Sequence, residues 1–155
     1  MVRGPNVLLG YYKDPDATAA TLRDGWLASG DLGALDDGYL KITGRKKEII
    51  ITSGGKNITP TNIEALLKQS DLVAEAVVVG DRRPYLVALL VLSPEGLARI
   101  ARQEGLDAEV LRREAATHPV LREALQAVVD RANAHLARVE TVKKFAVLPR
   151  ALDIE

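Results

Sequence analysis

The chain is 155 residues long, lacks cysteine and balances 21 acidic residues against 21 basic ones. The balanced charge gives no reason to expect nucleic acid as a partner, and the absence of cysteine excludes disulfides, thiolate metal sites and a cysteine nucleophile. No apolar run approaches the roughly 18 residues that span a bilayer, and the first residues do not resemble a signal peptide, so we expect a cytoplasmic protein without a transmembrane segment.

Residues 1–44 contain several turn signals and few large aliphatic side chains. Asp14-Pro15 predicts the cap and first residue of a short helix that runs to residue 22. Strands and turns alternate after it: strands over 26–27 and 39–42, a tight strand-to-strand turn at Gly30-Asp31, and a turn at Asp36-Asp37-Gly38. Because a segment of about 40 residues rarely builds its own core, we expect this one to be the end of a larger domain.

Residues 45–155 alternate β-rich runs with helical patterns and look more complete. The predicted strands are 48–52, 73–79, 85–92 and 144–148, and the predicted helices are 61–68, 97–103, 107–116 and 119–138. Thr61 with Glu64 forms a capping-box pattern, and Ser93-Pro94 is a strong helix start. A turn at 80–84 predicts a hairpin between the second and third strands. This mixture predicts an α+β fold in which helices pack on one face of a small sheet.

Two charged groups in the first half are candidates for ligand binding. A carboxylate at Asp31 can accept hydrogen bonds from two vicinal hydroxyls, as acidic residues do with ribose, although an ordinary Asx turn also explains Gly30-Asp31. The three cations Arg45-Lys46-Lys47 can bind a phosphate, or they can simply belong to a solvent-exposed turn that keeps a hairpin soluble. On an extended chain, Arg45 and Lys47 would point to one side and Lys46 to the other.

The segment Ser53-Gly54-Gly55-Lys56 looks at first like a phosphate loop, but it lacks the Gly-x-x-x-x-Gly-Lys-Ser/Thr spacing. Its paired glycines permit a positive φ and the close approach of a ligand or another backbone, and Lys56 adds a charge there. His118 and His135 lie 17 residues apart, which does not indicate a metal site. Ser29 and Ser53 have no histidine in register for a hydrolase triad.

Several segments follow one another in a distinctive order. They are Val2-Arg-Gly-Pro-Asn-Val7, Gly10-Tyr-Tyr-Lys-Asp-Pro15, Asp24-Gly-Trp26-Leu-Ala-Ser-Gly30-Asp31, Gly38-Tyr-Leu-Lys-Ile-Thr-Gly44-Arg45-Lys-Lys-Glu48 and Gly54-Gly55-Lys-Asn-Ile-Thr-Pro60-Thr-Asn-Ile-Glu64. This order resembles the AMP-forming acyl-CoA synthetases of the adenylate-forming superfamily over nearly the whole chain. The segments 77–89 and 145–150 resemble its long-chain fatty acid branch in particular.

Enzymes of this family join a carboxylate to ATP and then transfer the acyl group to coenzyme A, while a small C-terminal domain swings about a hinge. The resemblance implies that residues 1–44 end the large N-terminal adenylation domain and that residues 45–155 form the mobile C-terminal domain. It implies that Asp31 binds the ribose hydroxyls, that Arg45 also reaches the nucleotide, and that Lys47 is the hinge. The residues Ser53, Gly54, Gly55 and Lys56 correspond to the loop that enters the active site for thioesterification and lines the pantetheine channel.

The resemblance also implies what would lie outside this chain. The ATP-phosphate loop and the glutamate that serves magnesium would precede Met1, and the adenylation lysine would follow Glu155, so no catalytic residue is assigned here. Lys143 and Lys144 are not given that role. We therefore expect the C-terminal portion of a long-chain fatty acid CoA ligase, an enzyme that uses ATP, coenzyme A and magnesium; this portion should be inactive by itself and should have its own large domain as partner.

Some alternatives stay open on the sequence. One is a stand-alone, non-catalytic module that binds nucleotide, coenzyme A or a partner synthetase domain. A homodimer and a peripheral membrane contact are also open. The preferred acyl chain length cannot be read, because the resemblance places the acyl pocket in the large domain.

Overall fold

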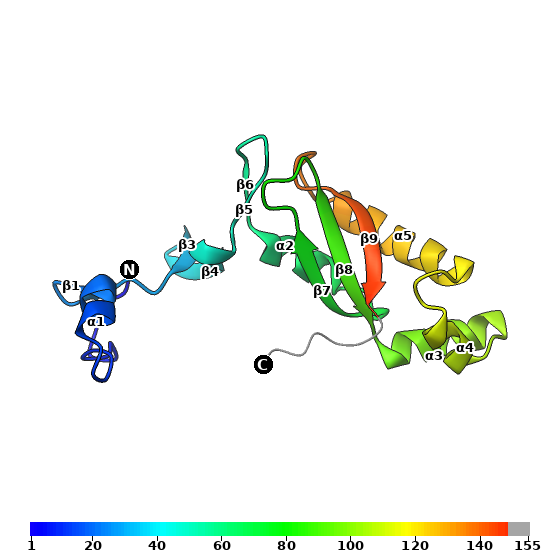
Figure 1. Ribbon diagram of the computed structural model, residues 1–155, viewed down its shortest axis with the longest axis horizontal. Helices are drawn as coiled ribbons and strands as arrows, with labels where there is room; N and C mark the ends of the chain where they lie inside the picture. Colours follow the sequence, from blue (N-terminus) through cyan, green and yellow to red (C-terminus); the bar gives the residue numbers. More distant parts are fainter. Residues whose placement is uncertain (149–155) are drawn as a thin grey trace. The chain divides into compact units, whose positions relative to one another are not determined.

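The computed structural model describes residues 1–148, and the chain divides into two compact units. The first unit runs from Met1 to Glu48, and the second begins at Ile49. Helices and small sheets occur in both, so the predicted α+β fold is confirmed (Figure 1). None of the described helices is long and apolar enough to cross a membrane.

The first unit begins with a capped helix and a short hairpin. Helix α1 spans Pro15–Thr21, and the Asp14 side chain accepts a hydrogen bond from the Ala17 amide at 2.9 Å, as the Asp-Pro signal predicted. Strand β1 (Leu22–Arg23) follows at once and pairs with β2 (Trp26–Leu27). Asp24 and Gly25 form the turn with φ values of 53° and 77°, the left-handed conformation that tight hairpins require.

A second hairpin ends the first unit. Strand β3 (Asp31–Asp36) pairs with β4 (Tyr39–Arg45) around the predicted turn, where Asp37 and Gly38 have φ values of 47° and 82°. The prediction of a turn at Gly30-Asp31 is wrong, because Asp31 opens β3 and pairs with Arg45. Every residue of β3 from Asp31 to Asp36 pairs with a residue of β4, so the strand begins directly after Gly30. A short 3₁₀ helix, η1 (Lys46–Glu48), follows.

The second unit is built on a mixed three-stranded sheet in the order β7-β8-β9. Strands β7 (Val73–Val79) and β8 (Leu86–Leu92) form the predicted antiparallel hairpin, and β9 (Val142–Leu148) lies parallel to β8. Helices α2 (Pro60–Leu67) and α5 (Pro119–Asn133) cover one face of the sheet, as Figure 1 shows. Alternate residues of β8 on this face, Leu86, Ala88 and Leu90, are fully buried in the core.

Helix α5 buries an apolar stripe at helical spacing, but it ends before the predicted range of 119–138 does. The buried residues of the helix are Leu121, Leu125, Val128, Val129 and Ala132. The helix stops at Asn133, five residues before the predicted end at Arg138. The side chain of Asn133 binds the start of β9 through the backbone of Val142, and this contact lies at the point where the helix ends.

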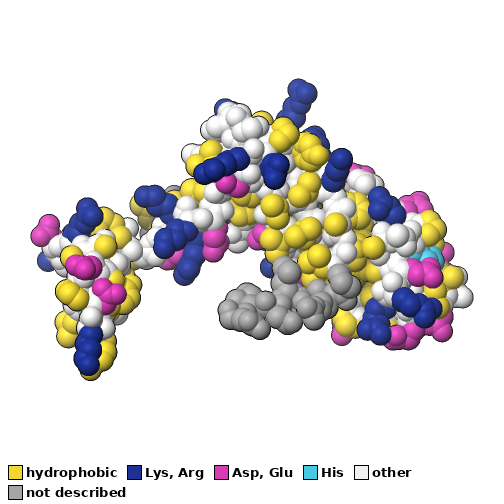
Figure 2. All heavy atoms as spheres, in the orientation of Figure 1, with side chains coloured by type: hydrophobic (Ala, Val, Ile, Leu, Met, Phe, Trp, Pro, Cys, Tyr) yellow, Lys and Arg dark blue, Asp and Glu magenta, His cyan; other side chains and the backbone are white. Residues whose placement is uncertain are grey.

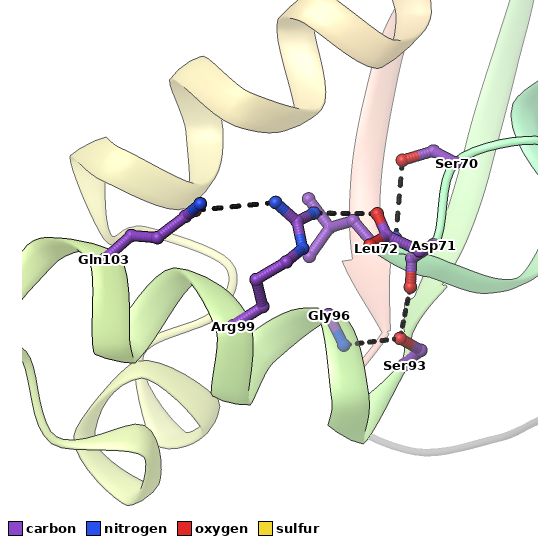
Figure 3. Close-up of polar contacts among 7 residues, drawn as sticks. All are labelled: Ser70, Asp71, Leu72, Ser93, Gly96, Arg99 and Gln103. Atoms are coloured by element: carbon purple, nitrogen blue, oxygen red, sulfur yellow. Dashed lines mark hydrogen bonds and ion pairs between the residues drawn. The ribbon is translucent and has the colours of Figure 1, made fainter.

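Helix α3 (Pro94–Glu104) is held against the segment before β7 by a polar network (Figure 3). Ser93 caps the helix by accepting from the Gly96 amide at 2.9 Å, and its hydroxyl donates to the Asp71 carbonyl. Arg99 on the next turn donates to the Asp71 carboxylate at 2.7 Å. A Cβ at Gly96 would lie 2.6 Å from Leu72 Cα, so this close approach requires glycine. Helix α4 (Ala108–Arg113) follows, capped by Asp107.

Two local predictions in the second unit are wrong. The strand expected over 48–52 shrinks to β5 (Ile50–Ile51), which pairs with a short β6 (Asn57–Ile58). The capping box of Thr61 and Glu64 does not form, since α2 begins at Pro60 after Thr59. Glu64 instead accepts a hydrogen bond from the Val78 amide at 2.9 Å, which joins α2 to β7. The last predicted strand, 144–148, forms but starts two residues earlier, as β9 (Val142–Leu148).

Candidate functional site

The two residues expected to bind nucleotide lie opposite each other on the β3–β4 hairpin. Asp31 is the first residue of β3 and Arg45 the last of β4, and the strand register pairs them. Arg45 Nε lies 3.4 Å from Asp31 Oδ1, with 67% of the arginine side chain and 30% of the carboxylate side chain exposed. An exposed ion pair of this kind adds little stability. The pair does offer a hydrogen-bond acceptor beside a cation, a combination suited to a polyhydroxylated, anionic ligand.

The two lysines after Arg45 do not continue the strand. Lys46 and Lys47 lie in the 3₁₀ helix η1, where the Lys46 amide donates to the Gly30 carbonyl at 2.8 Å. Successive side chains of a 3₁₀ helix are rotated by about a third of a turn, so the predicted two-sided alternation of Arg45, Lys46 and Lys47 is wrong. Lys47 immediately precedes Glu48, the last residue of the first unit.

The predicted glycine loop is the turn of the β5–β6 hairpin, and Thr52 closes it. The Thr52 carbonyl accepts from the Gly55 amide at 2.8 Å, and the Thr52 amide donates to the Lys56 carbonyl at 3.0 Å. The Thr52 hydroxyl accepts from the Lys56 amide at 3.2 Å. We call the segment 52–56 the glycine loop. Sequence reasoning missed the closing role of Thr52, for which a threonine just before Ser53-Gly54-Gly55-Lys56 was the only signal.

The two glycines of the loop differ in what the fold demands of them. Gly55 has a φ of 72°, a conformation that disfavours other residues. Gly54 does not have a positive φ, and a Cβ there would meet only the Thr52 hydroxyl, at 4.0 Å. The fold of the described chain therefore leaves room for a side chain at Gly54.

The turn between β7 and β8 supports the glycine loop from outside. The Arg82 amide donates to the Ile51 carbonyl at 2.8 Å, and the Ser53 amide donates to the Arg83 carbonyl at 3.1 Å. The Ile51 amide donates to Asp81 Oδ1 at 3.1 Å. Sequence reasoning treated this segment only as a hairpin turn, so it missed the role of Asp81. Three exposed cations, Lys56, Arg82 and Arg83, also lie on these two turns, and Figure 2 shows Lys and Arg side chains around this end of the unit.

Other parts of the described chain hold no comparable site. A groove of about 1040 Å³ lies between the end of α2, α3 and α5, but none of the predicted site residues lines it. Within residues 1–148, no group of three His, Asp or Glu side chains could hold a metal ion. The two histidines lie at opposite ends of α5: His118 directly precedes the helix, and the exposed His135 follows its end.

Comparisons with known proteins identify relatives along most of the chain. The family described as AMP-binding enzyme C-terminal domain matches residues 47–153. Long-chain-fatty-acid–CoA ligase FadD15 of Mycobacterium tuberculosis is 42% identical over 150 residues, which cover 96% of this chain and 25% of that protein. Long-chain-fatty-acid–CoA ligase 1 of Cavia porcellus is 36% identical over 160 residues, or 99% of this chain and 22% of that protein.

A solved structure has the same architecture. The o-succinylbenzoate CoA synthetase MenE of Bacillus subtilis, in complex with the acyl-adenylate intermediate OSB-AMP, matches with a TM-score of 0.69 at 32% identity. The match covers 96% of this chain and 26% of that chain. The chain therefore spans about a quarter of the length of the relatives that it matches.

Proposed function

This chain belongs to the family of AMP-binding enzyme C-terminal domains, and we propose that it serves as the C-terminal part of an AMP-forming long-chain fatty-acid CoA ligase. Such an enzyme joins a fatty acid to ATP with release of pyrophosphate, and then transfers the acyl group to coenzyme A with release of AMP. The relatives FadD15 and long-chain-fatty-acid–CoA ligase 1 match nearly the whole chain and are both fatty-acid CoA ligases. The alternative of a stand-alone binding module is therefore not favoured.

The proposed nucleotide contacts are Asp31 and Arg45. Their pairing across β3 and β4 supports this assignment, because one ligand could reach both side chains. The carboxylate would accept hydrogen bonds from the ribose hydroxyls, and the guanidinium would donate to the same nucleotide. Magnesium belongs to the proposal only for the whole enzyme, since no residue of this chain is assigned to it.

Lys47 is the proposed hinge. A hinge needs only one or two residues that absorb a change in φ and ψ. The end of the first unit at Glu48, directly after Lys47, supports this proposal. The assignment of residues 1–44 to a large adenylation domain and of 45–155 to a mobile domain is part of the same proposal, as is the cytoplasmic location.

The observation that supports a role of the glycine loop in thioester formation is the open space around Gly54. The fold leaves space for a side chain there, so a requirement for glycine would come from a ligand and not from packing within the chain. A narrow channel for the pantetheine arm would impose that requirement on Ser53, Gly54, Gly55 and Lys56. The cations of Lys56, Arg82 and Arg83 beside the loop suit coenzyme A, which carries phosphates.

A chimera tests this function. This chain would replace the aligned segment of FadD15 from Mycobacterium tuberculosis, and the chimera would be assayed with palmitate. Adenylation is followed by ATP–pyrophosphate exchange and thioester formation by release of palmitoyl-CoA. We expect both activities in the chimera. In the Gly54→Leu variant, adenylation should stay within about twofold while thioester formation falls by about a hundredfold, the size of effect expected when reacting groups are displaced by about 1 Å.

A matched control separates the loop from a general effect of added bulk. Thr61→Leu introduces the same side chain at an exposed position on α2, and both half-reactions should keep their rates. A chimera that folds but makes no adenylate and no thioester would refute the proposed function. Equal thioester rates with glycine and leucine at position 54 would refute the channel role of the loop.

A further inference from the structure

The glycine loop stands on a hairpin that is too short to hold itself in place. Strands β5 and β6 have two residues each, and only two residue pairs join them. A two-stranded hairpin is marginally stable by itself even when it is longer. The position of the loop relative to the sheet of the second unit therefore depends on contacts made outside the hairpin.

The turn between β7 and β8 supplies part of those contacts, beside Ile50 and Ile58, which are buried in the core. Both backbone groups of Ile51 bind this turn: its carbonyl accepts from the Arg82 amide, and its amide donates to Asp81 Oδ1. A third bond joins the Ser53 amide to the Arg83 carbonyl. Two of these three bonds join backbone atoms only and do not use the Asp81 side chain. Asp81 provides the one bond that depends on a side chain.

The chemistry of Asp81 makes this bond stronger than a neutral one. A carboxylate that accepts from a backbone amide forms a charge-assisted hydrogen bond, which is roughly twice as strong as a bond between neutral groups. Its second oxygen, Oδ2, lies 3.7 Å from Arg82 Nε. The carboxylate of Asp81 thus contacts both the loop hairpin and its own turn.

The backbone of the turn adopts an uncommon conformation at Arg82, the residue whose amide binds Ile51. Arg82 has a φ of 56°, a conformation that favours glycine over a residue with a Cβ. In this conformation its amide donates to Ile51 at 2.8 Å. Such strain persists only where the surroundings hold it, and it is often found at functional sites.

We propose that Asp81 is a positioning residue that holds the glycine loop at the angle to the β7–β8 sheet needed for thioester formation. The inference rests on the proposed function of the loop. It predicts that loss of the Asp81 carboxylate affects the coenzyme A step and spares adenylation, because Asp81 contacts the loop hairpin and its own turn, neither of which is assigned to adenylation. Asparagine at this position would keep an oxygen that can accept from the Ile51 amide.

The first test measures the contact itself in the 155-residue chain, without any FadD15 segment. Amide hydrogen exchange of Ile51 should be at least about threefold faster in Asp81→Ala, because the amide loses its acceptor and opens to solvent. Asp81→Asn should restore most of the protection. Unchanged exchange in Asp81→Ala would show that the carboxylate does not hold the hairpin and would overturn the inference.

The second test uses the FadD15 chimera. In Asp81→Ala, kcat/KM for coenzyme A should fall by about tenfold, as expected for a small displacement of positioning groups, while ATP–pyrophosphate exchange stays within about twofold. Asp81→Asn should recover the coenzyme A step to within about threefold, which a neutral acceptor in the same place allows. The control Glu95→Ala removes another exposed carboxylate of the second unit and should change neither half-reaction.

The outcomes separate the two proposals. An unsubstituted chimera without thioester formation would overturn the proposed function and this inference together. An active chimera in which Asp81→Ala and Asp81→Asn transfer the acyl group equally well would overturn the positioning role alone. An equal loss of adenylation and transfer in Asp81→Ala would also overturn it, because it would make Asp81 a residue of general stability.

Discussion

Asn133 joins the end of α5 to the start of β9, and its removal gives the sharpest stability prediction for this chain. Its Nδ2 donates to the Val142 carbonyl at 2.9 Å, and its Oδ1 accepts from the Val142 amide at 2.8 Å. Val142 is only 3% exposed, so water reaches its backbone poorly. Each lost bond removes about 0.5–1.5 kcal/mol, and a buried group left without a partner costs about 1–3 kcal/mol.

From these values we expect Asn133→Ala to lower the free energy of unfolding by about 2–4 kcal/mol. Urea unfolding of the chain measures this loss, followed by circular dichroism at the helical band. Helices α2–α5 all lie in the second unit, whereas the single tryptophan, Trp26, lies in the first and would not report on this contact. Asn62→Ala on the exposed face of α2 is the control, and it should be neutral or slightly stabilising because alanine favours helix.

Asn133→Asp sharpens the test through its pH dependence. The introduced carboxylate still accepts from the Val142 amide but faces the Val142 carbonyl without a proton to donate. Folding should therefore raise the pKa of this carboxyl above the roughly 3.9 of an unfolded chain. The protonated form is then favoured in the folded state, so the deficit relative to the parent chain should be largest near neutral pH and shrink as the pH falls through the raised pKa.

Two results would refute this reasoning. A loss below about 0.5 kcal/mol in Asn133→Ala would be typical of an ordinary surface substitution and would mean that the pair of bonds does not hold β9. A deficit in Asn133→Asp that stays constant between pH 7 and pH 4 would mean that the carboxyl does not face the carbonyl.

The remaining predictions concern a close contact and the hinge. Gly96→Ala should destabilise the chain by about 2 kcal/mol or more in urea unfolding, because the added Cβ would lie 2.6 Å from Leu72 Cα and 2.7 Å from the Asp71 carbonyl. Gly54→Ala, whose Cβ meets nothing closer than 4.0 Å, should change stability by less than about 0.5 kcal/mol, and similar costs for the two variants would contradict the packing argument. Lys47→Pro in the FadD15 chimera should preserve adenylation and reduce thioester formation, since proline fixes φ; equal loss of both half-reactions in a folded variant would rule out the hinge.

The elements that could be predicted from the sequence depend on residues within a few positions of one another. Asp14-Pro15 and Ser93-Pro94 cap the helices that they predicted, and Asp36-Asp37-Gly38 forms its turn. Each of these signals acts through a local hydrogen bond or a local backbone preference. Strands β7 and β8 were also recognisable, because β-rich runs flanked the turn at 80–84.

Two errors arose where a distant segment supplied the partner. Glu64 matches a capping box in the sequence. In the fold, β7 passes close to α2, and the Glu64 carboxylate accepts a hydrogen bond from the Val78 amide instead. The helical spacing of apolar residues continues to Leu136 in the sequence, yet the helix ends at Asn133, where the contact with Val142 forms. A pattern in a short window carries no information about such partners.

The sequence by itself determined the family, the local turns and caps, and the residue types offered to a ligand. The tertiary structure alone decided which of these residues meet. The register of β3 and β4 brings Asp31 beside Arg45, and the β7–β8 turn brings Asp81 to Ile51, 30 positions away. The physical reason is that a cap or a turn forms within one stretch of backbone, whereas a pairing between distant residues depends on strand register and on which segments pack side by side.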